Sequence, residues 1–241
     1  MTLARLYPAF ETYPGLSTEE QSWLIAKSYG ICNGWRVNFA VNQSGASYGL
    51  SGASADVSSD LDRLLLGKLR SLSDVIVTSG ATARAEKYKS SKHAPIAIFT
   101  TSGDLDAVPA IQGTQYFTPI VITDESHSKT VQDQLADVDA NVNAYDGAAS
   151  WPVGVAGVIT HDGFQSPILE SGLFSLRAFM TANVIDEICL TITQSGASGL
   201  SARQLSKEYL GQLFGNVEHF ELADLFVANG ACFSRWRRGN R

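Results

Sequence analysis

The sequence has few features that assign a function at once, and a long apolar run is the first one missing. No stretch approaches the ~18 consecutive apolar residues that a membrane helix requires. The N-terminal residues MTLARLYPAFETYPG contain neither the apolar core of a signal peptide nor an arginine- and serine-rich transit pattern. We therefore expect a cytoplasmic protein with no membrane partner.

Cysteine is also scarce. Cys32, Cys189 and Cys232 are odd in number, lie far apart and form no C-x-x-C pair. This pattern favours free thiols in a reducing compartment over a disulfide framework.

Basic residues are outnumbered, because 18 Lys and Arg stand against 24 Asp and Glu and give a net charge of -6. A general nucleic-acid binder neutralises many phosphates with a basic face, so we expect no nucleic-acid partner. Positive charge is concentrated locally at the C-terminus, which we interpret as a solvated chain end: Arg235, Arg237, Arg238 and Arg241.

Local metal-ligating and phosphate-binding patterns are missing as well. No metal site is predicted, because no histidine has a partner at i+4 or a cysteine at ligand spacing. The histidines are His93, His127, His161 and His219. Neither G-x-G-x-x-G nor G-x-x-x-x-G-K-S/T occurs, and the zinc-deaminase signature is absent.

The chain does have enough apolar residues for a substantial core, with 44% hydrophobic and 17% charged residues. It contains no long linker, repeat or low-complexity tract, so we expect one domain over residues 35–241. Residues 1–34 are expected to form an N-terminal extension. Within it, the capping-box spacing of Ser17 and Glu20 predicts a short helix.

From Trp35 onward, strand-like and helix-like segments alternate. Strands are predicted for WRVNFAV, DVIVTSG, PIAIFTT, PIVITD, PILES and VIDEICLTIT. Helices are predicted at 60–72, where Leu61, Leu64, Leu65, Leu69 and Leu72 share one face, and at 82–88, 127–135, 173–182, 202–214 and through VGVAGVI.

This alternation predicts an α/β fold with a mixed, mostly parallel sheet and helices on both faces. The tail HFELADLFVANGACFSRWR predicts two further strands around Asn229-Gly230, which is a hairpin signal. An antiparallel C-terminal edge is therefore expected.

The stretch Gly45-Ala46-Ser47-Tyr48-Gly49 matches the G-x-S-x-G nucleophile elbow of hydrolases and follows a predicted strand. An elbow enters a helix at once, whereas Gly52 and several small residues intervene before the leucines begin. We therefore interpret this stretch as a polar loop and rank a hydrolase last.

Two strand–helix junctions carry small residues and are better candidates for a binding site. Glu170-Ser171-Gly172-Leu173 follows one predicted strand, and Ser79-Gly80-Ala81-Thr82 follows another. Such a junction presents backbone N–H groups and the positive end of a helix, which suit a phosphate. Two of them in one alternating sheet indicate a nucleotide site across the carboxyl ends of the strands.

From about Trp35 to the C-terminus, the chain resembles the pyrimidine reductases of riboflavin biosynthesis, whose domain has the dihydrofolate reductase fold. The matching motifs occur in the family's order: Val41-Asn42-Gln43-Ser44-Gly45, Gly52-Ala53-Ser54, Leu69-Arg70, Gly80-Ala81-Thr82 with Glu86, and Glu170 and Gly172 followed by Asp186-Glu187. The form Ala85-Glu86-Lys87-Tyr88 is similar to a stand-alone reductase branch found in actinobacteria.

The resemblance implies an NADPH-dependent reductase, expected as a homodimer, that acts on a phosphorylated ribosylaminouracil. It implies that Ser54 and Arg70 hold the ribosyl 5-phosphate and that Glu170 contacts the pyrimidine. It also implies a set of NADPH-binding residues: Ala40, Gly80, Thr82, Glu86, Thr101, Ser102, Ser171, Gly172, Leu173, Phe174 and Ser175. From helical geometry alone, Arg70 lies opposite the leucine face, so a solvated arginine is an equally good interpretation.

Several positions depart from the family pattern. Asn38 stands where many members have lysine, Ser44 where aspartate is usual, and Asp56 where many have tryptophan. These departures keep two alternatives open, a reductase of a pterin or other heterocycle and a nucleotide-binding homologue without turnover. No arginine follows PIAIFTT to take a 2'-phosphate, so Thr101 and Ser102 remain there as hydroxyl donors.

Overall fold

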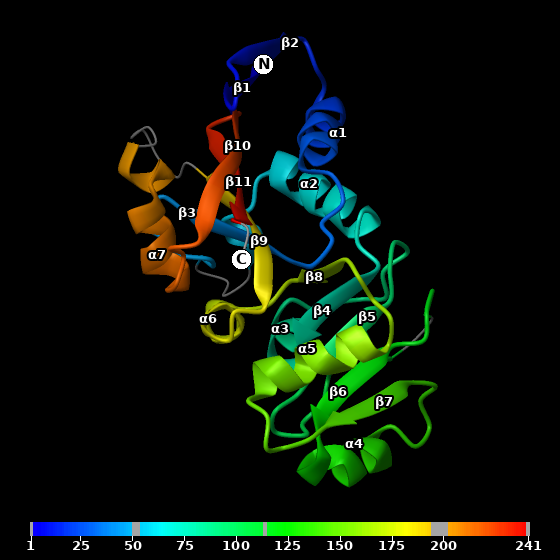
Figure 1. Ribbon diagram of the computed structural model, residues 1–241. Coiled ribbons are helices and arrows are strands. Elements are labelled where there is room, and N and C mark those ends of the chain that lie inside the picture. Colours follow the sequence, from blue (N-terminus) through cyan, green and yellow to red (C-terminus); the bar gives the residue numbers. More distant parts are fainter. Residues whose placement is uncertain (1, 50–53, 113–114, 194–201, 240–241) are drawn as a thin grey trace.

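The computed structural model of the protein describes residues 2–49, 54–112, 115–193 and 202–239 (Figure 1). Its centre is one sheet with the strand order β2-β1-β10-β11-β9-β3-β8-β4-β5-β6-β7. The neighbours from β9 to β7 run parallel, and those from β2 to β9 run antiparallel.

The parallel strands form the part of the sheet predicted from apolar runs, except that residues 141–145 were not predicted as a strand. They are β3 (Trp35–Asn42), β4 (Val75–Ser79), β5 (Ile96–Phe99), β6 (Ile120–Asp124), β7 (Asn141–Tyr145), β8 (Pro167–Leu169) and β9 (Ile185–Thr193). Nearly continuous apolar sequence is what a strand covered on both faces requires, and β4, β5 and β8 are buried almost throughout.

The antiparallel part contains the predicted C-terminal hairpin, β10 (Phe220–Ala228) and β11 (Ala231–Arg238). Asn229 and Gly230, with φ of 52° and 73°, make the left-handed turn that joins these strands. β11 pairs with β9, so the hairpin extends the sheet as expected.

Residues 1–34 contribute two strands that the sequence analysis did not predict, β1 (Thr2–Tyr7) and β2 (Glu11–Pro14). β1 pairs with β10 and therefore continues the antiparallel edge. Both strands are short and largely exposed, so they lack the apolar alternation that identifies a strand. The predicted helix is confirmed as α1 (Thr18–Tyr29), with the Ser17–Glu20 capping box formed.

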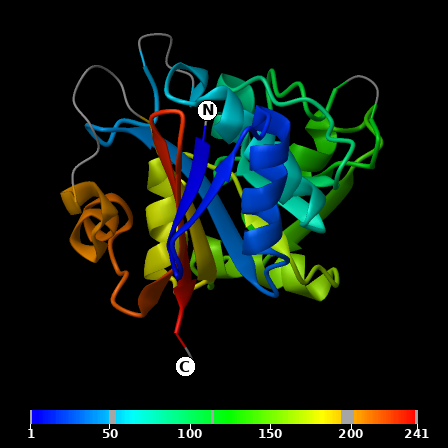
Figure 2. The same ribbon diagram turned by 90° about the horizontal axis from the view of Figure 1, so that it is seen from above.

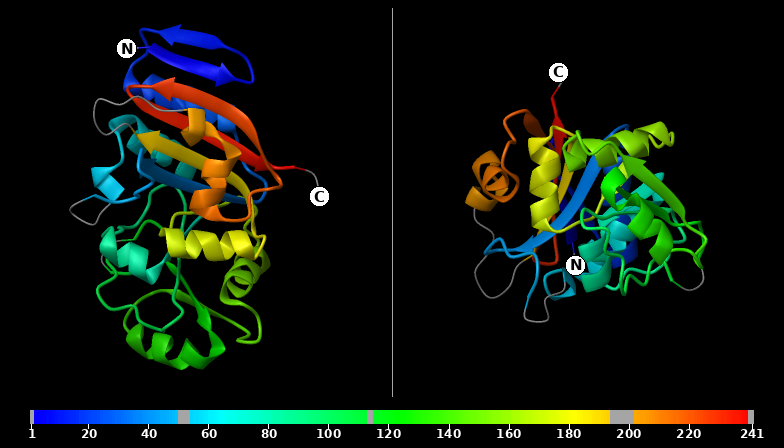
Figure 3. Two further views of the ribbon diagram at one scale, coloured as in Figure 1. Left: turned by 90° about the vertical axis from the view of Figure 1, so that its left-hand side faces the viewer. Right: turned by 90° about the horizontal axis from the view of Figure 1, so that it is seen from below.

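Helices cover both faces of the sheet (Figures 2 and 3). The core on one face contains residues of four helices: α1, α2 (Asp60–Ser71), α3 (Gly80–Ala85) and α4 (Ser128–Gln134). The core on the opposite face contains residues of three helices: α5 (Trp151–His161), α6 (Leu173–Thr181) and α7 (Lys207–Phe214). Short 3₁₀ helices span Ser54–Asp56, Glu125–His127 and Ala202–Leu205. The predicted fold class is thus confirmed. Within the described ranges, no helix is long and apolar enough to cross a membrane.

Helix α2 follows its leucine pattern. Ser59 Oγ accepts the backbone N–H of Asp62 and caps the helix, while Leu61, Leu65 and Leu69 are buried against the sheet. Asp62 is buried beside them, which the leucine pattern does not predict.

The interpretation of the C-terminal arginines as a solvated chain end is wrong for two of them. Arg235 is paired with Asp224 at 2.5 Å and also donates to the carbonyl of Tyr29. Arg238 donates to the carbonyl of Ile185 and lies over the ring of Phe220. Arg237 is exposed, and Arg241 lies outside the described residues. Strand β11 places these arginines against long-range partners that a local pattern does not show.

The three cysteines are free and buried, as their number and spacing predicted. Burial raises the pKa of the Cys32 thiol and of the Cys232 thiol to about 12 each. Both thiols therefore stay protonated and unreactive at neutral pH.

Candidate active site

A cavity of about 350 Å³ opens where the carboxyl ends of β4 and β8 lead into helices, beside β3 and the first turn of α2. Half of the predicted site residues line it: Ala40, Ser54, Thr82, Glu86, Glu170, Ser171 and Gly172. Because β3, β8 and β4 are parallel neighbours, these residues meet although they lie far apart in the chain.

Thr82 links the two junctions. Its Oγ1 lies 2.9 Å from Ser79 Oγ and 3.4 Å from Ser171 Oγ, and it accepts the N–H of Gly172 at 3.1 Å. The N–H of Gly172 is thus already bonded in the protein, contrary to the expectation of free N–H groups at that residue. The two strand–helix turns form one connected wall.

The start of α6 still offers backbone N–H donors in the residues that follow Gly172. Gly172, with φ of -63° and ψ of 160°, caps this helix without a side chain, and the first internal bond runs from Leu176 N to Gly172 O. The N–H groups of the residues between them precede that first bond. Together with the helix dipole they form a place for an anion.

Glu170 is the most tightly held side chain of the site. Arg70 Nε and Nη2 donate to its two oxygens at 2.8 and 2.6 Å, and the Tyr88 hydroxyl donates at 2.7 Å. Burial, with the Glu170 carboxylate beside it, raises the pKa of Tyr88 well above its usual value, so Tyr88 remains a donor. Arg70 is 26% exposed and does not line the cavity. The alternative of a merely solvated arginine is therefore wrong.

Ser54 and Glu86 are joined by a hydrogen bond in the wall of the cavity. The backbone N–H of Ser54 donates to Glu86 Oε1 at 2.9 Å. Gly52 and Ala53, which belong to the same motif, lie outside the described residues.

The remaining predicted cofactor residues do not line the cavity. Gly80 begins α3, where an added Cβ would stand 3.4 Å from the carbonyl oxygen of Asp104, so this glycine serves close packing. Thr101 and Ser102 are exposed in the loop after β5. Ser175 is buried in α6. Leu173 and Phe174 line a separate surface hollow next to α5, and Phe174 is 82% exposed.

Of the departures at Asn38, Ser44 and Asp56, one lies in the cavity wall. Asn38, on β3, lines it next to Ala40. Ser44 donates its hydroxyl to Asn42 Oδ1 at 2.7 Å within the turn that ends β3. Asp56 packs on Gly49, whose added Cβ would approach Asp56 Cβ to 2.5 Å.

The G-x-S-x-G stretch is a loop of turns and bends, as predicted from its small residues. No helix follows Ser47 directly, so the strand–turn–helix geometry of a nucleophile elbow is not formed. Within the part of the chain that the structure describes, no group of His, Cys, Asp and Glu side chains is arranged to hold a metal ion.

Two residues of the cavity wall, Tyr88 and Asp62, were not predicted as site residues from the sequence. Tyr88 appeared in the quoted motif, but its bond to Glu170 depends on a contact across 82 positions of the chain. Asp62 stands in the first turn of a helix three residues after its cap Ser59, and this local pattern gives no signal of a cavity residue.

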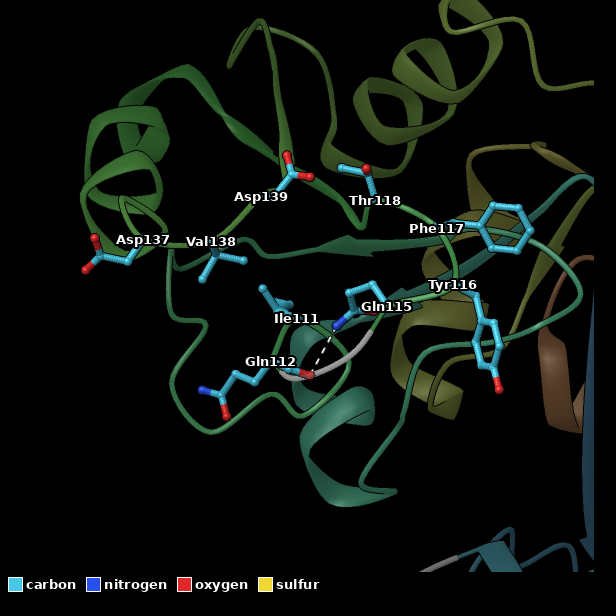
Figure 4. A pocket seen from close by; sticks show the side chains of 9 residues that line it. All are labelled: Ile111, Gln112, Gln115, Tyr116, Phe117, Thr118, Asp137, Val138 and Asp139. Atoms are coloured by element: carbon cyan, nitrogen blue, oxygen red, sulfur yellow. Dashed lines mark hydrogen bonds between the residues drawn. The ribbon is translucent and has the colours of Figure 1, made fainter.

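A larger hollow of about 610 Å³ lies at the far end of the sheet and is lined by residues 111, 112, 115–118 and 137–139 (Figure 4). Among the described residues that line it, the charged ones are Asp137 and Asp139. None of the predicted site residues reaches it, so the candidate active site is the smaller cavity at the junctions.

Comparisons with known proteins agree with the fold described above. The model of the family described as the RibD C-terminal domain matches residues 37–194. No curated protein matches the sequence.

Three solved structures share the fold. A pyrimidine reductase-like protein of Corynebacterium diphtheriae is 20% identical, with a TM-score of 0.64, over 94% of this chain and 100% of that one. Acinetobacter baumannii RibD is 16% identical, with a TM-score of 0.61, over 92% and 62%. The riboflavin biosynthesis reductase Rib7 of Saccharomyces cerevisiae is 13% identical, with a TM-score of 0.58, over 85% and 89%.

Proposed function

Because the chain belongs to the RibD C-terminal domain family, we propose that it is an NADPH-dependent reductase of 5-amino-6-(5-phosphoribosylamino)uracil. Hydride would be delivered to the ribosyl C1', which opens the sugar to a ribityl chain. The observation that supports this most directly is the convergence of Thr82, Gly172 and Glu170 on one cavity. A homodimer in the cytoplasm is proposed with it, on the same resemblance.

The residues at the start of α6 fit the pyrophosphate of a dinucleotide. An added Cβ at Gly172 would meet only Thr82 Oγ1, at 3.8 Å, so the space above this residue is open. The backbone N–H groups of residues 173–175 and the hydroxyls of Ser171 and Thr82 would hold the phosphates, and Gly172 leaves room for them. When bound, the nicotinamide supplies the hydride, and the chain contributes position and exclusion of water.

The substrate would lie on the α2 side of the cavity. Ser54 and Glu86 supply polar groups at its mouth, and Glu170 supplies acceptor oxygens that Arg70 and Tyr88 hold in place. A carboxylate fixed in this way orients a sugar or ring donor without itself transferring a proton. We propose that Arg70 also reaches the ribosyl 5-phosphate.

The assay that tests the function is absorbance of NADPH at its nicotinamide band with the deaminated ribosylaminouracil phosphate. Substrate-dependent oxidation supports the proposal. Oxidation with a pterin instead would support the second candidate, which the asparagine at Asn38 in the cavity favours. Nucleotide binding with no oxidation on either substrate would indicate a homologue without turnover.

Gly172→Val should weaken NADPH binding by roughly 1 to 3 kcal/mol, because a branched side chain would occupy the space proposed for the pyrophosphate. Gly172 has an extended backbone that valine adopts freely, and no neighbour stands closer than Thr82, so the variant should fold. Titration by nicotinamide fluorescence measures the loss. Unchanged affinity in a folded variant would remove this site from consideration.

We expect a modest preference for NADPH over NADH, about tenfold. Arg84 does reach the loop after β5, where Nε donates to the carbonyl of Asp106, but its Nη2 is 3.0 Å from the Asp104 carboxylate. That carboxylate repels a 2'-phosphate. Asp104→Asn should therefore increase the preference in a comparison of the two cofactors. Discrimination above about a thousandfold in the wild type would reveal a basic clamp elsewhere.

A further inference from the structure

Helix α1 exposes an aromatic side chain while it buries polar ones. Trp23 is 48% exposed, whereas Gln21 and Ser22 on the buried side of the helix are 2% and 0% exposed. Both polar side chains are satisfied locally, because Gln21 donates to the carbonyl of Leu16 and Ser22 to that of Glu19. Packing within this chain therefore does not explain why the indole stands half in solvent.

The exposed side of α1 carries a stripe of three residues at helical spacing, Glu19, Trp23 and Lys27. Because they stand at i, i+4 and i+8, they share one face, with about 6 Å of helix axis on either side of Trp23. The negative end of the stripe is in the first turn and the positive end in the last turn. Figure 2 shows α1 on the outside of the molecule, so this stripe faces solvent.

A hollow of about 630 Å³ with mostly apolar walls lies beside the stripe. It is lined by Trp23, Leu24, Lys27, Gly30, Ile31 and Leu72. Ile31, two residues after the helix ends, is 66% exposed, so a second large apolar side chain stands in solvent here. Exposed aromatic and aliphatic groups around an apolar hollow are typical of the centre of a protein interface.

We propose that a second copy of this chain packs on this surface, with the two α1 helices antiparallel and Trp23 at the two-fold axis. The indole of each copy then lies against the hollow of the other. This assignment rests on the homodimer proposed together with the reductase, and it names the surface that forms the dimer. Helix α1 precedes residues 37–194, so the surface belongs to a segment outside the match to the family model.

The charges of the stripe favour this partner and this orientation. A two-fold axis through Trp23 places Glu19 of each copy opposite Lys27 of the other, because both residues stand about one turn from the axis. Parallel helices would place like charges together instead. Lys68 pairs with Glu19 and lies 4.5 Å from the centre of the Trp23 ring. The Glu19 side chain is still 52% exposed, so it can accept from Lys27 of the other copy as well.

Charge reversal tests the surface. Light scattering over a concentration series measures the dissociation constant of the wild-type dimer, and Lys27→Glu should raise it about tenfold or more, because carboxylates then face Glu19. Adding Glu19→Lys should recover most of this loss, since the two charges are then exchanged. Lys129→Glu is the matched control, because it makes the same reversal at an exposed side chain of α4, at the other end of the molecule (Figure 1). It should leave the dissociation constant unchanged.

Introduced cysteines test the antiparallel orientation with Trp23 intact. In Glu19→Cys combined with Lys27→Cys, each new thiol faces one of the other copy, so mild oxidation should give a disulfide-linked dimer. The single variants should not cross-link, because a residue one turn from the axis lies about 12 Å along the helices from its own copy. The native cysteines are buried and do not compete.

The outcomes separate this surface from the proposed function. An unchanged dissociation constant in Lys27→Glu, or equal cross-linking in the single and double variants, would overturn the α1 surface. A wild type that stays monomeric at every concentration would overturn it too, yet substrate-dependent NADPH oxidation by that monomer would leave the reductase in place. A dimer that responds to charge reversal as expected but oxidises no NADPH would support the surface and contradict the reductase.

Discussion

Glu187→Ala should lower the free energy of unfolding by about 3 to 5 kcal/mol, because it leaves the buried guanidinium of Arg36 without its charge partner. The two side chains are 2.7 Å apart on adjacent parallel strands, and that of Arg36 is only 1% exposed. Arg36 Nη1 already has no partner, so no spare acceptor compensates. Urea unfolding followed by far-UV circular dichroism measures the loss.

Glu221→Ala is the control for this prediction, since it removes an exposed glutamate from a strand of the same sheet. We expect it to change the free energy of unfolding by less than about 0.5 kcal/mol. Replacing both partners, Arg36→Met with Glu187→Leu, should recover most of the stability because neither charge is then left alone. A loss below about 1 kcal/mol in Glu187→Ala would contradict the assignment of a stabilising pair.

The buried guanidinium of Arg36 also helps to hold the N-terminal segment against the sheet. Arg36 Nη2 donates to the carbonyl of Gly30, and Arg235 donates to that of Tyr29, at the end of α1. Asp224, fully buried in β10, accepts from Arg5 of β1 and Ser28 of α1. The segment is therefore fixed to the rest of the sheet by bonds from β1 and from α1.

The fold could be predicted from the sequence wherever a strand or helix leaves a pattern in its own residues. Apolar runs and the Asn229-Gly230 turn identified the strands from β3 onward except β7, and leucine spacing identified α2, because burial on one or both faces imposes those patterns on neighbouring residues. β1 and β2 carry no such pattern, since they are short edge strands stabilised by pairing with a distant hairpin.

The residues of the candidate site likewise fall into those that a local pattern predicts and those that depend on contacts between distant segments. Glycine and threonine at strand–helix junctions are visible in sequence, and Thr82 and Gly172 do meet. The pairing of Arg70 with Glu170 joins residues 100 positions apart, and only the sheet order brings them together. A side chain's partner, unlike its helix or strand, is set by tertiary contacts.

Arg70→Ala should weaken substrate binding by roughly 2 to 5 kcal/mol and leave NADPH affinity unchanged. Its bidentate bond to Glu170 adds a second expectation, a fall in the free energy of unfolding of about 2 to 4 kcal/mol, because the Glu170 carboxylate is buried and keeps only Tyr88. Arg70→Lys should recover part of both losses, since a point charge cannot reproduce the fork. Substrate constants, NADPH titration and urea unfolding are measured on each variant.

Two roles of Arg70 can be separated with a substrate that lacks the phosphate. If Arg70 holds the phosphate, wild type and Arg70→Ala should bind the dephosphorylated compound equally. If Arg70 acts by positioning Glu170, the variant should lose affinity for both compounds, and Tyr88→Phe should weaken them in the same direction because it removes the other bond to that carboxylate. Normal substrate kinetics in Arg70→Ala would discard the phosphate assignment and favour a substrate that carries no phosphate.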